Sequence, residues 1–201
     1  VYTNKIMKAL KTSIIACAAL LSLGSCDFLD KEPTITTSGS YFNNESEAES
    51  FLNGVYAILT QPTFYGNQYF YLAGGDDLTA YGGSGRQPSN GGLICNNATT
   101  GDPYVAGLWY TLYSGINRAN TLLENLPKVP GLSESKNKLF TAQTRFLRAF
   151  YYFNLVQCWG DVPFKTSSTQ SVEGLQIART PKAQIYDFIC KEMDEAANDL
   201  P

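Results

Sequence analysis

Residues 61–104 hold the largest group of side chains that could bind a ligand. The segment is dense in tyrosine, asparagine, serine and glycine, and no helical period of apolar residues runs through it. Rigid aromatic rings beside adaptable hydrogen-bonding groups are typical of binding loops. A long irregular segment inside a compact domain usually has a function. We therefore expect an ordered loop region that packs partly on helices and carries binding residues.

Catalytic chemistry has little support in the sequence. The chain has no histidine, which removes the commonest general base near neutral pH and the commonest metal ligand. Asp76 and Asp77 could suggest the paired carboxylates of a glycoside hydrolase. Adjacent residues on an extended chain point apart, however, and no second acidic cluster accompanies them. We therefore expect no enzyme, no cofactor and no metal site.

The amino-terminal residues are typical of a targeting signal. Three lysines precede an uncharged apolar run that is too short to span a bilayer but has the length of a signal-peptide core. The run ends in Leu23-Gly24-Ser25-Cys26, which resembles a bacterial lipobox. We expect residues 1–25 to be a lipoprotein signal peptide and Cys26 to carry the lipid anchor. The alternative is an ordinary signal peptide followed by a chance cysteine.

Residues 26–43 have the composition of a tether, with Thr, Ser and Pro and no apolar period. Asp27, Asp30 and Glu32 lie close behind the lipidated cysteine. They resemble the acidic signal that exports Bacteroidetes lipoproteins to the outer leaflet of the outer membrane. A solvated tether without such a signal is the alternative.

Residues 44–201 show the apolar spacing of four amphipathic helices. Asn44 and Glu47 resemble a capping box for the first helix, which should end before Pro62. The second is expected at about 105–126. Short and medium connections between helices favour antiparallel hairpins. The predicted fold is all-α, and periodicity alone leaves an α-solenoid and a simple bundle open.

The third and fourth helices are bounded by capping and stop signals. Ser133 is expected to cap the third helix, and Gly160 to end it. Residues 160–179 should form a loop, after which Thr180 would cap the fourth helix with Pro181 at its first position. Cys158 and Cys190 fall within these helical patterns and are expected to be buried thiols.

The stretch from Thr141 to Pro163 combines two arginines with a run of aromatics. Its apolar residues cover more than one helical face, which predicts a helix that is buried on most sides. Arg145 and Arg148 could bind an anion. The more favoured interpretation is that they pair with acids, such as Asp161, or stack on neighbouring aromatic rings.

The charge balance bears on the kind of partner. The formal net charge is −3 and the isoelectric point is near 5.0, so nucleic acid is not an expected partner.

Four blocks of the sequence resemble SusD/RagB-type nutrient-binding lipoproteins. They are DFLDKEP behind the lipobox cysteine, YTLYSGINRANTLL at 110–123, AQTRFLRAFYYFNLVQCWGDVP at 142–163, and the RTP, IY and LP motifs between 179 and 201. The blocks occur in the family's order and cover most of residues 26–201. The 142–163 block is the most specific of them.

The resemblance implies a surface-exposed, lipid-anchored protein of the outer membrane. Its fold would consist of tetratricopeptide-like helical hairpins with long irregular loops, and this chain would be the amino-terminal part of a longer SusD-like fold. Such a protein would cap a SusC-like TonB-dependent transporter and deliver oligosaccharides to it without catalysis. The alternatives are a scaffold of the same kind that captures peptides or another nutrient, and a helical-repeat scaffold that binds only protein.

A glycan ligand would need aromatic faces for its C–H groups and planar polar groups for its hydroxyls. Residues 61–104 offer both densely. The alternative for each residue is that the tyrosines pack on helices and the Asn and Asp residues form turns. The candidate ligand-binding residues are Asp76, Asp77, Tyr81, Arg86, Asn96, Asn97 and Tyr104.

Overall fold

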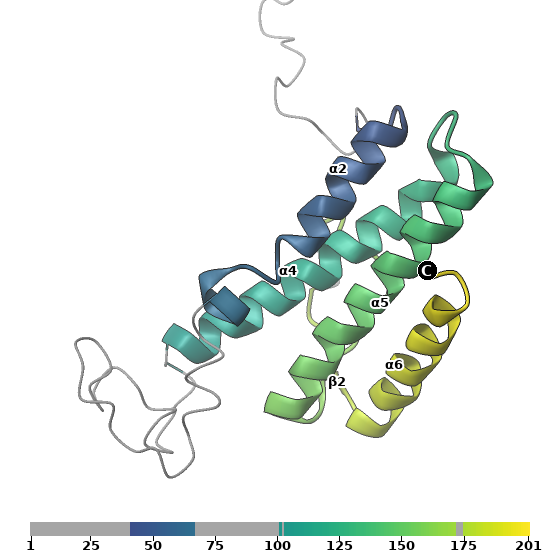
Figure 1. Cartoon of the computed structure of the whole chain (residues 1–201). Coiled ribbons are helices and arrows are strands. Elements are labelled where there is room, and N and C mark those ends of the chain that lie inside the picture. The colour runs from purple at the N-terminus through teal and green to yellow at the C-terminus, as the bar shows by residue number, and fades with distance from the viewer. Residues whose placement is uncertain (1–40, 67–100, 102, 172–174) are drawn as a thin grey trace, which may run out of the picture. The chain divides into compact units, whose positions relative to one another are not determined.

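The computed structural model describes residues 41–66, 101, 103–171 and 175–201 of the 201. The chain divides into two units, Val1–Tyr41 and Phe42–Pro201. In its described part the second unit is built from helices, and its strands are two short ones. Figure 1 shows helices α2, α4, α5 and α6 of this unit running alongside one another.

The first helix, α2 (Glu45–Tyr56), begins as its sequence predicts. The Asn44 side chain accepts a hydrogen bond from the Glu47 backbone N–H at 3.0 Å. The Glu47 carboxylate in turn accepts from the Asn43 backbone N–H at 2.8 Å. This reciprocal arrangement is a capping box displaced by one residue, since the usual partner of the glutamate is the N-cap N–H itself. A single helical turn, η1 (Pro62–Gly66), follows α2 and buries the Phe64 ring.

Two long helices form the central hairpin. Helix α4 (Pro103–Asn125) is followed by the turn η2 (Leu126–Lys128) and by α5 (Glu134–Trp159). Ser133 caps α5 by accepting from the Lys136 backbone N–H at 3.3 Å, as predicted. Gly160 ends the helix with φ of +70°, a conformation that glycine adopts without steric cost.

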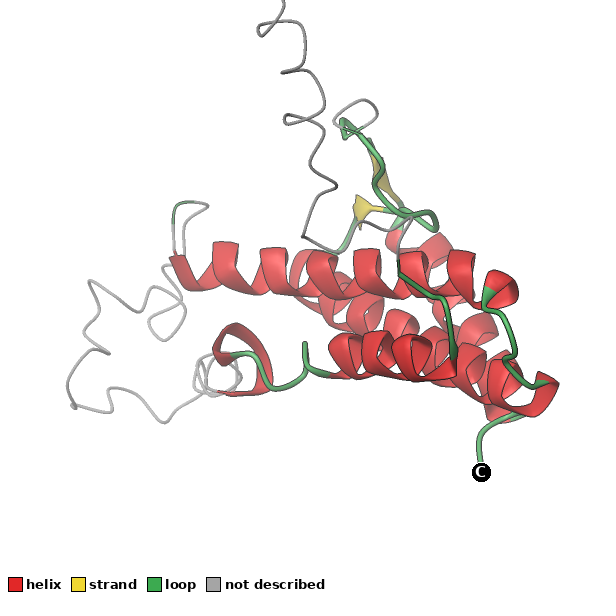
Figure 2. Cartoon of the chain, turned by 90° about the horizontal axis from the view of Figure 1, so that it is seen from above, coloured by secondary structure: helices red, strands yellow, loops and turns green. Residues whose placement is uncertain are grey.

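The start of the last helix differs from the prediction. Helix α6 (Lys182–Ala197) has Pro181 as its N-cap, and no Thr180 side-chain cap exists. The Asp161 carboxylate supplies the cap instead, accepting from the Lys182 backbone N–H at 2.8 Å. Thr180 belongs to β2 (Arg179–Thr180), which pairs antiparallel with β1 (Val162–Pro163). The predicted 160–179 loop therefore begins and ends in a two-stranded ladder, which lies to one side of the helices in Figure 2.

Side-chain contacts fix the direction of the helices relative to each other. Trp109 meets Trp159, and Asn120 meets Arg148, so α4 and α5 are antiparallel. Arg148 also meets Glu192 and Tyr152 meets Phe188, so α5 and α6 are antiparallel. Helix α2 runs antiparallel to α4, with the Gly54 carbonyl bound by Arg118 at 2.8 Å. The predicted all-α fold of stacked antiparallel hairpins is confirmed.

The hydrophobic core lies where α4, α5 and their neighbours meet. Burial of apolar side chains from all four helices supplies most of the stabilisation of the fold. Among the described helices, none is long and apolar enough to cross a membrane. The largest fully buried side chains are Tyr151, Tyr152, Phe64, Leu112, Ile116, Leu122, Leu126, Leu147, Leu155, Ile185 and Val55.

Three residues are less buried than the sequence predicts. The apolar spacing of α5 places Phe146 on one stripe with Ala142 and Ala149, yet 40% of the Phe146 surface is exposed while those two residues are buried. The thiols of Cys158 and Cys190 are also exposed and free, so the expectation of buried thiols is wrong. Each lies on an outward face of a helix that is only partly covered.

Candidate functional site

The residues predicted to bind ligand lie almost entirely outside the described part of the chain. Asp76, Asp77, Tyr81, Arg86, Asn96 and Asn97 fall between 67 and 100, and the lipidation candidate Cys26 falls before residue 41. Tyr104 lies in the first turn of α4, and its side chain is not described. These assignments stay predictions.

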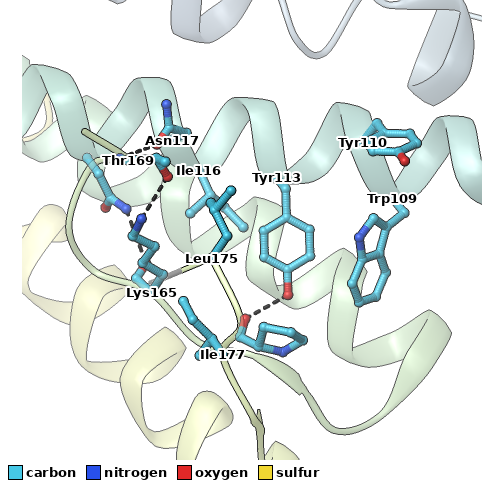
Figure 3. Close-up of a pocket in the computed structure, with 11 residues that line it drawn as sticks. Trp109, Tyr110, Tyr113, Ile116, Asn117, Lys165, Thr169, Leu175 and Ile177 are labelled. Atoms are coloured by element: carbon cyan, nitrogen blue, oxygen red, sulfur yellow. Dashed lines mark hydrogen bonds between the residues drawn. The ribbon is translucent and has the colours of Figure 1, made fainter. Parts of the chain in front are cut away.

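A pocket of about 440 Å³ lies beside α4, against the segment that follows β1. This volume is within the range of roughly 300–1,000 Å³ that is usual for small-ligand sites. Figure 3 shows Trp109 and Tyr113 extending from α4 toward the segment that carries Leu175 and Ile177. The residues that line the pocket are Trp109, Tyr110, Tyr113, Ile116, Asn117, Asn120, Pro163, Lys165, Thr169, Leu175 and Ile177.

Aromatic rings of α4 form one wall of this pocket. Trp109 packs edge-to-face on Trp159 of α5, with ring centroids 5.2 Å apart, and contacts Tyr113 at 4.8 Å. These contacts hold the Trp109 and Tyr113 rings in place. Tyr110 is 73% exposed, so its ring is available at the mouth of the pocket.

The opposite wall is residues 163–169, which we call the strap, and α4 holds the strap by its backbone. The Tyr113 hydroxyl donates to the Pro163 carbonyl at 2.6 Å. The Asn120 amide donates to the carbonyls of Lys165 at 3.1 Å and Ser167 at 3.0 Å. The Asn117 side-chain oxygen accepts from the Thr169 N–H at 2.8 Å (Figure 3). Three side chains on one face of α4, spaced three and four residues apart, therefore bind four separate backbone groups of the strap.

Tyr152 of α5 fixes the backbone of Lys165 from the other side. Its hydroxyl donates to the Lys165 carbonyl and accepts from the Lys165 N–H, both at 2.8 Å. Burial raises the pKa of Tyr152 to about 12, and the hydrogen bond from Lys165 lowers it in part. The neutral hydroxyl is the form that can donate to the carbonyl.

The raised pKa of Tyr152 predicts a loss of stability in alkali. The folded-state pKa lies above the unfolded value of 10.0, so the stabilising contribution is complete below pH 10 and disappears as the pH rises toward 12. By pH 12 we expect the wild-type protein to lose about 2 kcal/mol more than a Tyr152→Phe variant. Urea unfolding followed by circular dichroism between pH 8 and 12 measures this. Parallel pH curves for the two proteins would contradict it.

A buried ion pair between Arg148 and Glu192 connects Asn120, which binds the strap, to α6. Arg148 donates to the Glu192 carboxylate through Nε at 3.0 Å and through Nη2, and to the Asn120 side-chain oxygen through Nη1 at 2.8 Å. Its guanidinium also lies 5.2 Å from the centre of the Phe188 ring. Arg145 pairs with Glu195. Both arginines thus pair with acids as favoured, but Asp161 is not their partner, because its carboxylate caps α6.

Other charged groups of the described chain do not form a second site. A smaller pocket of about 210 Å³ lies between α5 and α6, where Arg145 is already paired with Glu195. Within residues 41–66, 103–171 and 175–201, no group of three or more His, Cys, Asp or Glu side chains is placed to hold a metal ion.

The α4 pocket is not evident from the amino-acid sequence. The spacing of Leu108, Leu112 and Ile116 predicts a core stripe that includes Trp109, and in the structure Trp109 is half-buried because it lines the pocket. The signal in the sequence is that Tyr110 lies off the apolar stripe of the helix, which predicts an aromatic ring on its outer face. The sequence near α4 gives no sign of the other wall, because Lys165 and Leu175 lie 40 and 50 residues beyond Asn125, the last residue of α4.

The chain matches known proteins along most of its length. A SusD-like family model, described as starch-binding associating with outer membrane, matches residues 27–201. SusD-like protein P2 of Formosa agariphila is 31% identical over 205 residues, covering 97% of this chain and 39% of the relative. SusD-like protein P25 of the same organism is 26% identical, covering 91% of this chain and 36% of the relative.

Solved structures are similar in fold as well. A laminarin-binding SusD-like protein is 34% identical with a TM-score of 0.70, and the match covers 79% of this chain and 35% of that protein. A SusD homologue from Bacteroides thetaiotaomicron is 30% identical with a TM-score of 0.72, covering 85% and 33%. The chain thus spans less than two fifths of the length of each of these relatives. The extent of the family match shows that the chain belongs to the SusD-like family, described as starch-binding and associating with the outer membrane.

Proposed function

We propose that the protein containing this chain is a non-catalytic surface lipoprotein that captures oligosaccharides and delivers them to a SusC-like TonB-dependent transporter. The observation that carries the proposal is the SusD-like match over residues 27–201. The similarity to a laminarin-binding SusD-like protein supports carbohydrate as the ligand class. The outer-membrane association in the family's description agrees with an anchor at Cys26.

Glycan capture is assigned to the predicted residues between 76 and 104, with the helical hairpins as their support. Helix α4 begins at Pro103, directly behind that segment, and its antiparallel contacts with α5 hold it along its length. When a rigid helix holds one end of a binding loop, the loop loses less conformational entropy on binding a ligand, and the affinity is higher.

Affinity electrophoresis of the complete gene product in gels containing starch or laminarin tests the capture role. We expect the wild-type protein to be retarded by at least one polysaccharide. Replacing Tyr81, Arg86 and Tyr104 together by alanine should abolish the retardation. Alanine at the exposed residues Lys128, Gln157 and Lys182 serves as the control and should leave it unchanged. Equal mobility of the wild type with and without every polysaccharide would refute the proposal.

The transporter and anchor are tested separately from ligand binding. The wild-type lipoprotein should co-purify from membranes with a large β-barrel protein, and a Cys26→Ala variant should leave the membrane fraction. Incubation with polysaccharide should produce no new reducing ends. Release of reducing ends by the purified protein would assign it to the hydrolases instead.

A further inference from the structure

Lys165 places a positive charge in the α4 pocket without an acidic partner. Its ammonium group donates to the Thr169 hydroxyl at 2.7 Å, and among the described residues it forms no ion pair. Among the described residues that line the pocket none is acidic, and Glu173 lies outside the described part of the chain. The acid farther along the same face of α4, Glu124, is engaged by the Ser168 backbone N–H at 2.7 Å and by the Ser168 hydroxyl. The charge of Lys165 therefore remains available to a ligand.

Buried groups hold the backbone of the residue that carries this charge. The Lys165 peptide is held by the Tyr152 hydroxyl and the Asn120 amide, whose residues are 0% and 1% exposed. Lys165 itself is half-buried, so its stem lies along the pocket while its ammonium stays at the polar end. A cation on an anchored backbone loses less freedom on binding than one on a mobile loop.

Two more donors in the pocket have no protein acceptor in the described structure. The Asn117 amide oxygen accepts from Thr169, but neither its NH₂ group nor the Trp109 indole N–H has an acceptor among the described residues. Donors without acceptors favour a ligand rich in oxygen. The ring of Tyr110 at the mouth offers an apolar face beside them.

We propose that this pocket binds a carboxylated sugar residue, a hexuronate of an acidic oligosaccharide. Its C–H groups would lie against the aromatic wall of Trp109 and Tyr110, its hydroxyls would accept from Asn117, and its carboxylate would pair with Lys165. The site is separate from the candidates at 76–104, and it rests on the proposed function in that the ligand is a glycan. It narrows the ligand from oligosaccharides in general to acidic oligosaccharides.

Calorimetric titration of the complete protein with defined hexasaccharides tests the site. The probes are hexagalacturonate and hexamannuronate, against maltohexaose and laminarihexaose as neutral probes. We expect tighter binding of at least one uronate probe, and an affinity for it that falls as salt is added. Lys165→Met should weaken that binding about 10- to 100-fold, the range for a lost hydrogen bond to a charged group. Lys128→Met, at an exposed lysine in η2, is the matched control and should bind as the wild type does.

The outcomes separate this site from the proposed function. Tyr110→Ala should also weaken uronate binding; the Tyr110 side chain is exposed in this chain, and a circular dichroism spectrum of the variant checks that the complete protein keeps its fold. If neutral and acidic hexamers bind equally and neither Lys165→Met nor Tyr110→Ala changes the affinity, the pocket proposal fails while glycan capture stands. If no saccharide binds at all, glycan capture fails and the pocket proposal with it. Tighter binding of hexaglutamate than of any uronate would assign the pocket to acidic peptides and overturn the proposal.

Discussion

Replacing Arg148 by alanine is expected to lower the free energy of unfolding by about 3–5 kcal/mol, the range for breaking a buried ion pair from one side. Arg148 is 7% exposed and its partner Glu192 is 5% exposed. Alanine would leave the Glu192 carboxylate buried without its strongest donor and would free the Asn120 side-chain oxygen. Chemical denaturation at pH 7 measures the loss.

Two controls show whether burial is the cause. Lys138→Ala breaks an exposed ion pair in which the Lys138 Nζ lies 2.8 Å from the Glu134 Oε1. This change should lower the free energy of unfolding by less than about 1 kcal/mol. A double variant, Arg148→Met with Glu192→Leu, removes both charges and should recover most of the stability that Arg148→Ala loses. A loss at Arg148→Ala no larger than that at Lys138→Ala would contradict the prediction.

Replacing Tyr151 by alanine is expected to cost about 3–5 kcal/mol, because the ring is fully buried and its removal leaves a cavity. Tyr151 extends from α5 between α2 and α4. Its hydroxyl donates to the Val55 carbonyl at 2.7 Å, and its ring contacts Phe64 edge-on. Tyr151→Phe keeps the ring and should cost only about 1 kcal/mol through the lost hydrogen bond, because the Val55 carbonyl still accepts from the Ile58 backbone N–H at 3.3 Å.

The glycine opposite this ring provides a second test of the same packing. A Cβ at Gly115 would lie 2.7 Å from two carbons of the Tyr151 ring, which is closer than real contacts allow. Gly115→Ala should therefore destabilise the wild type by about 1–3 kcal/mol, although helix propensity alone favours alanine by about 1 kcal/mol. In the Tyr151→Ala background the same change should stabilise the protein. Additive effects of the two substitutions would show that residues 115 and 151 are not in contact.

Local signals in the sequence predicted the helices well. Asn44 and Ser133 cap their helices because the side chain and the N–H it accepts from are three residues apart, a relation that sequence displays directly. Thr180 was a wrong prediction for the opposite reason. The donor and acceptor of the true cap, Lys182 and Asp161, are 21 residues apart and meet only because the β1–β2 ladder brings them together.

Partner choice and exposure depend on packing that the sequence does not display. Asp161 was the acid that the sequence suggested for the arginines, because it is near them along the chain, whereas the antiparallel register of α5 and α6 brings Glu192 to Arg148. The same register leaves Cys158 and Cys190 on the outward faces of helices that are only partly covered. The α4 pocket depends on a contact between segments about 50 residues apart, so neither wall indicates it alone.

The strap is recognised through its peptide groups, and this has a consequence for specificity. Tyr113, Asn120 and Tyr152 bind carbonyls that any residue would supply, so the path of the strap is independent of most of its side chains. The residues at positions 165 and 169 can then be exchanged without moving the backbone that presents them. A lysine here could become a glutamine or a tyrosine at little structural cost. The α4–α5 hairpin thus holds the strap backbone in one position whatever side chains the strap carries. Substitutions in the strap are therefore the most direct way to engineer a new ligand preference in the pocket.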